Sequence, residues 1–243
     1  HIWAHKGPIF FEKSWIHAKI SRGKASGAFS HPTVPKCHPY ILVNFQGKIR
    51  DVMTLAHELG HGIHQYLANK NGVLIADTPL TLAETASVFG EMLTFRKMLE
   101  NTTDPVKRKH LLANKVEDMI NTVVRQIAFY DFECKLHAAR VNGELTPDQI
   151  NEIWMSIQGE SLGPVFNFVE GYETFWTYIP HFIHSPFYVY AYAFGDGLVN
   201  ALYAVYEEGD TDFQNKYFDM LSAGGSMHHK AVSYTHLTLP TKA

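Results

Sequence analysis

The residues with the clearest chemical potential are two histidines and a glutamate in one short stretch. His57, Glu58 and His61 form the pattern H-E-x-x-H. On an α-helix, residues four apart lie on one face, so both imidazoles can reach a single Zn²⁺ at about 2.0–2.1 Å. In this motif the glutamate takes a proton from the water that the metal activates. The spacing therefore predicts a zinc hydrolase site.

The same spacing also occurs in amphipathic helices whose histidines are ordinary surface or core residues. Here the neighbouring residues are apolar or small, which predicts a buried helix: Val52, Met53, Leu55, Ala56, Leu59, Ile63, Leu67 and Ala68. Burying two histidines and a glutamate without partners costs on the order of several kcal/mol. A bound metal ion offsets that cost, so we favour a metal site over the structural alternative.

The composition narrows the class of protein. A length of 243 residues suits one large domain or two small ones. The net charge of −3 gives no reason to expect nucleic acid or an anionic membrane as a partner. No apolar run reaches the ~18 residues that span a bilayer, and no secretory signal is recognisable. Cys37 and Cys134 are far apart in sequence, so we expect both to be reduced and the protein to be cytoplasmic.

The elements around the motif are predicted to be mostly helical. A run rich in β-branched and aromatic residues, 40–45, predicts one strand before the motif. Asp51 is the predicted N-cap of the metal-site helix, which is expected to reach about Ala68. Further helices are predicted over residues 78–101, 104–143, 146–159, 186–208 and 211–222, with an irregular aromatic segment over 160–185. The fold class is therefore mainly α with a small β element near the N-terminus.

The end of the chain differs from the rest. Residues 227–243 show neither a helical nor a strand period, and they look like translated cloning or adapter sequence. We therefore predict one folded domain over residues 1–226, followed by a non-native or disordered tail over residues 227–243.

A zinc hydrolase needs a third protein ligand beside the two histidines. His64 lies seven residues after His57, which places it about 10 Å further along the helix, too far to share one ion. The long metzincin motif is excluded because Leu67 stands where its third histidine belongs. Glu84 and Glu91, two turns apart on the next predicted helix, remain as candidates. The residues alone leave the choice between them open.

The motif and its surroundings resemble a known peptidase family. The stretch His57–His61 followed by Ala83–Ser87 is similar to the thimet oligopeptidase/oligoendopeptidase F family of zinc peptidases. The likeness extends over nearly all of residues 1–226 and includes these further motifs: Gly27–Ser30, His38–Asn44, Ile179–Phe182, Phe187–Tyr192 and Leu221–Ser226.

This resemblance implies roles for individual residues. It implies one Zn²⁺ per chain with His57, His61 and Glu84 as ligands, and Glu58 as the general base. It also implies that a histidine and a tyrosine after the aromatic segment stabilise the transition state. His181 and Tyr188 match that pair best.

Two other tyrosines, Tyr190 and Tyr192, match the family's transition-state tyrosine less well. For all of these tyrosines, simple core packing at helical spacing is the alternative.

The resemblance also implies the fold and the substrates. It implies a helical, zincin-like catalytic half of a clam-shell peptidase, with substrates limited to short peptides. Family members are longer, and their N-terminal helical region forms the other half of the clam-shell, which we expect to be missing here. The predicted function is a zinc-dependent endopeptidase, and the alternative is a catalytically inactive zinc-stabilised helical fragment that only binds peptides. The intact Glu58 favours the enzyme, because a purely structural zinc site does not need it.

Overall fold

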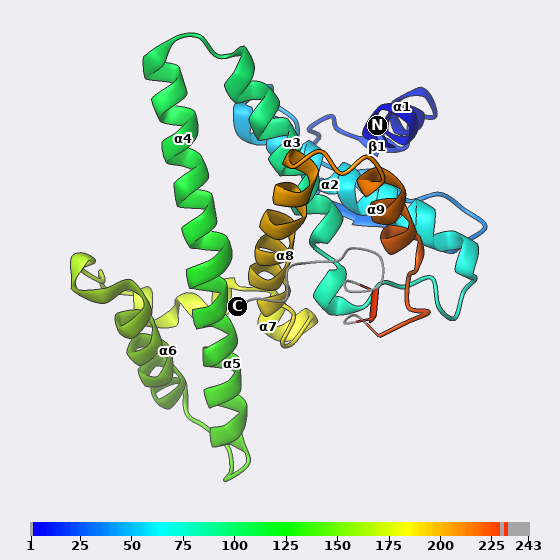
Figure 1. The fold of residues 1–243 in the computed structure, drawn as a ribbon. Helices are drawn as coiled ribbons and strands as arrows, with labels where there is room; N and C mark the ends of the chain where they lie inside the picture. The colour runs from blue at the N-terminus through cyan, green and yellow to red at the C-terminus, as the bar shows by residue number, and fades with distance from the viewer. Residues whose placement is uncertain (1, 229–230, 233–243) are drawn as a thin grey trace. The chain divides into compact units, whose positions relative to one another are not determined.

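The structure is a computed structural model that describes residues 2–228, 231 and 232. Figure 1 shows the ribbon coloured by residue number. The chain divides into two compact units. The first unit comprises His1–Lys109 and Gly195–Ala243, and the second comprises His110–Phe194. The H-E-x-x-H motif lies in the first unit.

The described residues are mainly helical, with one small sheet near the N-terminus, which confirms the predicted fold class. The α-helices are α1 (Ile2–Glu12), α2 (Ile49–Ala68), α3 (Thr85–Asn101), α4 (Pro105–Ile120), α5 (Gln126–Arg140), α6 (Pro147–Leu162), α7 (His181–His184), α8 (Tyr190–Glu207) and α9 (Phe213–Ser222). The strands are β1 (Ile16–His17), β2 (Phe29–His31) and β3 (Tyr40–Leu42).

The sheet has β3 at its centre. β1 pairs with β3 in parallel, with Ile16 opposite Ile41, and β2 pairs antiparallel, with Ser30 opposite Ile41. The observed strand β3 is therefore shorter than the strand predicted over 40–45. Beyond its end, the backbone N–H groups of Val43 and Phe45 still donate hydrogen bonds to the backbone oxygens of residues 17 and 18. Ile41 is buried against α2, so the sheet supports the helix that carries the motif.

The start of α2 corrects one prediction. Lys48, with extended backbone, is the N-cap, and Asp51 lies three residues later. The Asp51 carboxylate accepts hydrogen bonds from the backbone N–H groups of Gln46 (2.7 Å) and Lys48 (3.0 Å). Asp51 thus folds the preceding turn back onto the helix and places a negative charge at its positive end. These backbone donors hold the pKa of Asp51 below its ordinary value.

Three other boundaries also differ from the prediction. The helix predicted to start at Thr78-Pro79 begins at Thr85, after a short 3₁₀ turn over Leu80–Leu82. The long helix predicted over 104–143 contains a π-helical segment, Asn121–Arg125, between α4 and α5. α8 begins at Tyr190 rather than near Pro186.

The first unit buries α2 and α3 between two apolar clusters. One cluster joins α1, the sheet and α2 through Phe10, Ile41 and Ile63. The other joins α3, α8 and α9, with the ring of Phe89 lying 4.8 Å from that of Tyr217. α2 packs directly on α3. Because apolar clusters pack against both sides of the α2–α3 pair, the polar side chains between these helices are held in place by close packing.

The second unit is organised around Trp154 of α6, which is fully buried. Its ring contacts those of Phe129 and Phe132 on α5, at centroid distances of 5.5 and 5.2 Å. The indole N–H donates a hydrogen bond to the backbone oxygen of Tyr172 (3.0 Å). This contact fastens the aromatic segment after α6 to the α5–α6 pair.

Gly60 sets the distance between α2 and α3. A Cβ atom at this position would lie 2.4 Å from the backbone oxygen of Ala86 and 2.5 Å from the Cα atom of Ser87. We expect Gly60→Ala to lower the free energy of unfolding by about 1–3 kcal/mol or more, because a backbone cannot move aside as a flexible side chain can. Urea denaturation measures this change.

The control for Gly60→Ala is Gly159→Ala in α6, where an added Cβ would meet no atom within 4 Å. Alanine there should leave stability unchanged or raise it by up to ~1 kcal/mol. If Gly60→Ala proved as stable as Gly159→Ala, the close contact of the two helices would be refuted.

The predicted tail falls mostly on residues 229–230 and 233–243, which lie outside the described residues. Of the described part, Val232 is buried and belongs to the cluster of α3, α8 and α9. The boundary at residue 226 and the non-native character of residues 227–243 stay predictions.

Candidate metal centre

α2 brings His57 and His61 together on one face. Their Nε2 atoms lie 3.1 Å apart, and both side chains are about one-fifth exposed. The opposite face of the helix carries Leu59 and Ile63, which are buried against α1 and the sheet. The amphipathic pattern of the sequence thus turns the two imidazoles away from the apolar core and toward α3.

Glu84 reaches the same point from the N-cap position of α3. Its Oε2 atom lies 3.3 Å from Nε2 of His57 and 3.3 Å from Nε2 of His61, and the residue is 1% exposed. The structure therefore brings together the three residues that the resemblance implied as ligands. Among the described residues, they form the one group of histidine, cysteine and carboxylate side chains arranged closely enough to hold a metal ion.

The size of this triangle suits zinc. Ligand atoms at about 2.0–2.1 Å from a tetrahedral ion lie about 3.3–3.4 Å from one another. The three distances here are 3.1, 3.3 and 3.3 Å. Two imidazole nitrogens and one carboxylate oxygen are also the donor set of a catalytic rather than a structural zinc site. The residues present therefore fit a zinc ion.

Glu91 contacts the first histidine from behind. Its Oε1 atom lies 2.6 Å from Nδ1 of His57. A hydrogen on Nδ1 can donate to this carboxylate, while Nε2 of the same ring faces His61 and Glu84. The structure thus separates the two glutamates that the sequence left as alternatives: Glu84 joins the triangle, and Glu91 contacts His57 at Nδ1.

The carboxylates also set the charge of the site. Burial alone lowers the pKa of His57, but the hydrogen bond to Glu91 and the negative charges of Glu84, Glu91 and Glu58 outweigh it and raise the pKa to about 9. The centre therefore favours positive charge strongly, as a cation site must.

We expect Glu91→Gln to weaken zinc binding by about 10–100-fold while leaving the ion bound at micromolar zinc. The amide keeps the shape of the side chain but removes the negative charge behind His57. Competition with a chromophoric chelator measures the affinity. Unchanged affinity would show that the contact with His57 does not support the site.

Glu58 is buried beside the ligands. It is 6% exposed, and its Oε2 atom has no hydrogen-bond partner among the described residues. Burial raises the pKa of this carboxyl above its ordinary value, although the neighbouring His57 and His61 oppose the shift. An unpartnered buried carboxylate next to a cation site is available to accept a proton, which suits the predicted general base.

His64 lies outside the metal triangle, as its distance along the helix predicts. It is buried, and burial lowers its pKa to about 3, so the ring is neutral at physiological pH. Its Nε2 atom lies 3.2 Å from the hydroxyl of Thr78. His64 therefore anchors the loop that leads from α2 to Glu84.

His181 and Tyr188 belong to the second unit and lie close to each other. Their rings stack at a centroid distance of 5.8 Å. The hydroxyl of Tyr192, which the sequence ranked lower, lies 3.2 Å from Nε2 of His181. The rings of Tyr188 and Tyr192 lie 5.4 Å apart, so both tyrosines contact the histidine and each other.

The segment that carries Tyr188 is held by a buried carboxylate. Glu133 on α5 is 1% exposed, and its Oε1 atom accepts a hydrogen bond of 2.7 Å from the backbone N–H of Phe187. Phe187 has a φ of +61°, which is unfavourable for an aromatic residue and persists where surrounding contacts enforce it.

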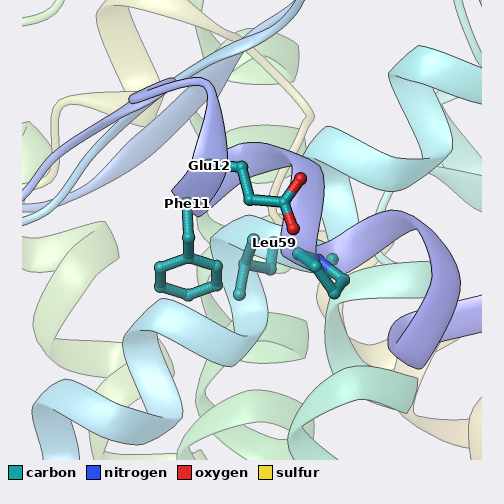
Figure 2. A pocket seen from close by; sticks show the side chains of 5 residues that line it. Phe11, Glu12 and Leu59 are labelled. Carbon is teal, nitrogen blue, oxygen red and sulfur yellow. The ribbon is translucent and has the colours of Figure 1, made fainter.

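A separate pocket lies on the other side of α2. Figure 2 shows Phe11 and Glu12 of α1 beside Leu59. The pocket has a volume of about 450 Å³, and Gly7 and Pro8 complete its lining. Leu59 follows His57 by two residues, so it points about 200° away around the helix. This pocket is therefore distinct from the face that carries the metal ligands.

None of the helices in the described part of the chain has both the length and the apolar character needed to cross a lipid bilayer.

Comparison with known proteins places the chain among peptidases. An oligoendopeptidase F homolog from Borreliella burgdorferi is 34% identical over 236 residues, which cover 96% of this chain and 40% of that protein. A homolog of the same name from Lactococcus lactis is 34% identical over 230 residues, covering 92% and 38%. The crystal structure of a protein described as a peptidase from Chlamydophila abortus aligns with a TM-score of 0.70 and 30% identity, covering 94% and 38%.

The chain thus spans 38–40% of the length of these relatives. The model of one family, described as peptidase family M3, matches residues 2–239. This match includes the metal triangle, Glu58 and the segment with His181 and Tyr188. Because it covers nearly the whole sequence, the chain belongs to peptidase family M3.

Proposed function

We propose that this chain carries the catalytic centre of a zinc-dependent endopeptidase that hydrolyses short peptides. The observation that carries the proposal is the meeting of His57, His61 and Glu84 within 3.1–3.3 Å, with Glu58 buried beside them and its Oε2 atom without a hydrogen-bond partner among the described residues. Family membership supports peptide hydrolysis. The names of two relatives, both oligoendopeptidase F homologs, support short peptides as substrates.

His57, His61 and Glu84 would hold the zinc ion, and Glu91 would keep the His57 ring in the ligating tautomer. Zinc bound by such residues activates water and polarises a carbonyl group. Glu58 then accepts the proton of the attacking water at its Oε2 atom and passes it to the nitrogen of the leaving amine. The glutamate carries one proton between two atoms, so it returns to its starting state after each turnover.

The negative charge that develops on the substrate's carbonyl oxygen needs a hydrogen-bond donor. We assign this role to His181 with Tyr188, and the hydroxyl of Tyr192 on His181 supports including it as a partner. Donors of this kind act most strongly in the transition state, where the charge is greatest.

The direct test measures metal content and cleavage together. The protein should bind one zinc ion per chain and cleave a quenched fluorescent short peptide, and a chelator should remove both properties. Zinc binding without cleavage would favour the inactive, zinc-stabilised fragment. Cleavage that survives complete metal removal would refute the proposed chemistry.

Tyr188→Phe should lower kcat by about 10²-fold with little change in KM, which is the signature of a lost donor in the transition state. Steady-state kinetics with a short peptide measure both constants. Tyr192→Phe provides the comparison, because it removes the hydroxyl that contacts His181. If Tyr188→Phe lowers the melting temperature but leaves activity per folded molecule normal, Tyr188 is a packing residue.

A further inference from the structure

The carboxylate of Glu84 is held by a neighbouring hydroxyl. The Oγ atom of Ser87 lies 2.8 Å from Oε2 of Glu84, the same oxygen that faces both imidazoles, and 2.9 Å from the Glu84 backbone oxygen. Ser87 is completely buried. In a site without competing bulk water, this O–H donor restricts the directions in which Oε2 can present its remaining lone pair.

The stem of Glu84 is held from another side by the backbone of α8. A Cβ atom on Gly195 would lie 2.7 Å from the Cβ atom of Glu84, closer than two such atoms can approach. It would also lie 3.4 and 3.5 Å from the carbonyl carbon and oxygen of Glu84. Gly195 is buried within a helix, so space rather than an unusual backbone conformation requires glycine here.

These two contacts act on a single ligand. A free glutamate side chain samples many rotamers, and fixing it when a metal binds costs conformational entropy. Packing against Gly195 and the hydrogen bond from Ser87 impose that order beforehand, so less affinity is lost on binding. Ser87 lies three residues after Glu84, so its hydroxyl proton can also be donated to the Glu84 backbone oxygen within the first turn of α3. A purely structural role for Ser87 is therefore the alternative to exclude.

We infer that Ser87 and Gly195 are positioning residues that set the zinc affinity of this centre by locking Glu84. Ser87 orients the ligating oxygen, and Gly195 leaves the space that the side chain occupies. The inference rests on the proposed function, because it presupposes that Glu84 binds zinc.

The test compares zinc affinities of matched variants of the full chain. Ser87→Ala and Gly195→Ala should each bind zinc about 10–100-fold more weakly in competition with a chromophoric chelator. Thr85→Val is the control for Ser87→Ala. It removes another buried hydroxyl from the same helical turn, and this hydroxyl has no hydrogen-bond partner among the described residues. Gly197→Ala is the control for Gly195→Ala. Gly197 lies on the same helix, and a Cβ atom added there would meet no atom within 4 Å. Both controls should bind zinc as the parent protein does.

The melting temperature of each metal-free variant separates positioning from packing. If Ser87→Ala and Gly195→Ala lower that temperature but keep the parent zinc affinity, their role is structural and the inference is overturned. If Gly195→Ala does not fold, Ser87→Ala decides the question alone. If the parent protein binds no zinc, the proposed function fails. If the parent and both variants bind zinc with the same affinity, only the inference about Ser87 and Gly195 fails.

Discussion

Replacing Glu58 with glutamine should leave zinc bound and reduce peptide cleavage by about 10²–10⁴-fold. Glutamine has nearly the same size and shape as glutamate, but its amide cannot accept the proton of the attacking water. Glu58 directly follows His57, so its side chain points about 100° away around the helix and is not expected to be a ligand itself. The metal content and the cleavage rate of a fluorogenic short peptide are measured on the same preparation.

The fold should tolerate this substitution. Oε2 of Glu58 has no hydrogen-bond partner among the described residues, and burial already raises its pKa toward the neutral form. A neutral amide should therefore leave the melting temperature unchanged or raise it. If Glu58→Gln kept full activity, another residue would have to serve as the general base. Loss of zinc together with activity would instead make Glu58 part of the metal-binding apparatus.

Glu84→Gln should lose zinc affinity by more than the ~10–100-fold that is typical of residues behind the ligands. The substitution removes the only negative charge among the three ligating groups and replaces the oxygen that lies 3.3 Å from both imidazoles with part of a neutral amide. Bound metal stabilises the folded state, so the melting temperature in the presence of zinc should also fall. Chelator competition and thermal unfolding with and without zinc measure the two effects.

Glu91→Gln is the matched comparison, because it removes an equal charge from the same helix at the contact with Nδ1 of His57. Its effect on zinc affinity should be the smaller of the two. The opposite order, with zinc lost in Glu91→Gln and kept in Glu84→Gln, would move the third ligand along α3. Such a result would contradict the geometry of the triangle.

Local features of the fold were predictable because they depend on residues close in sequence. The apolar residues around His57 and His61 predict α2 as a buried helix, and a spacing of four residues is enough to place the imidazoles together. The distance argument against His64 depends only on the helical rise, and the buried, neutral His64 lies outside the triangle. Helix ends were less predictable: the Asp51 carboxylate accepts hydrogen bonds from the turn that precedes α2, and α3 begins at Thr85 only after a short 3₁₀ turn.

The sequence by itself determined the class of fold, the two histidine positions and the glutamate beside them. Its residues left Glu84 and Glu91 as equal candidates, and only the resemblance to a family separated them. The tertiary structure gives these two carboxylates different neighbours. Glu84 lies at the start of α3 and faces both imidazoles, whereas Glu91 lies two turns further along and contacts Nδ1 of His57. The contact between Gly195 and Glu84 was also invisible in sequence, because α8 meets Glu84 across more than a hundred residues of chain. Helical period follows from local sterics, whereas the contacts of a buried carboxylate follow from how distant segments pack.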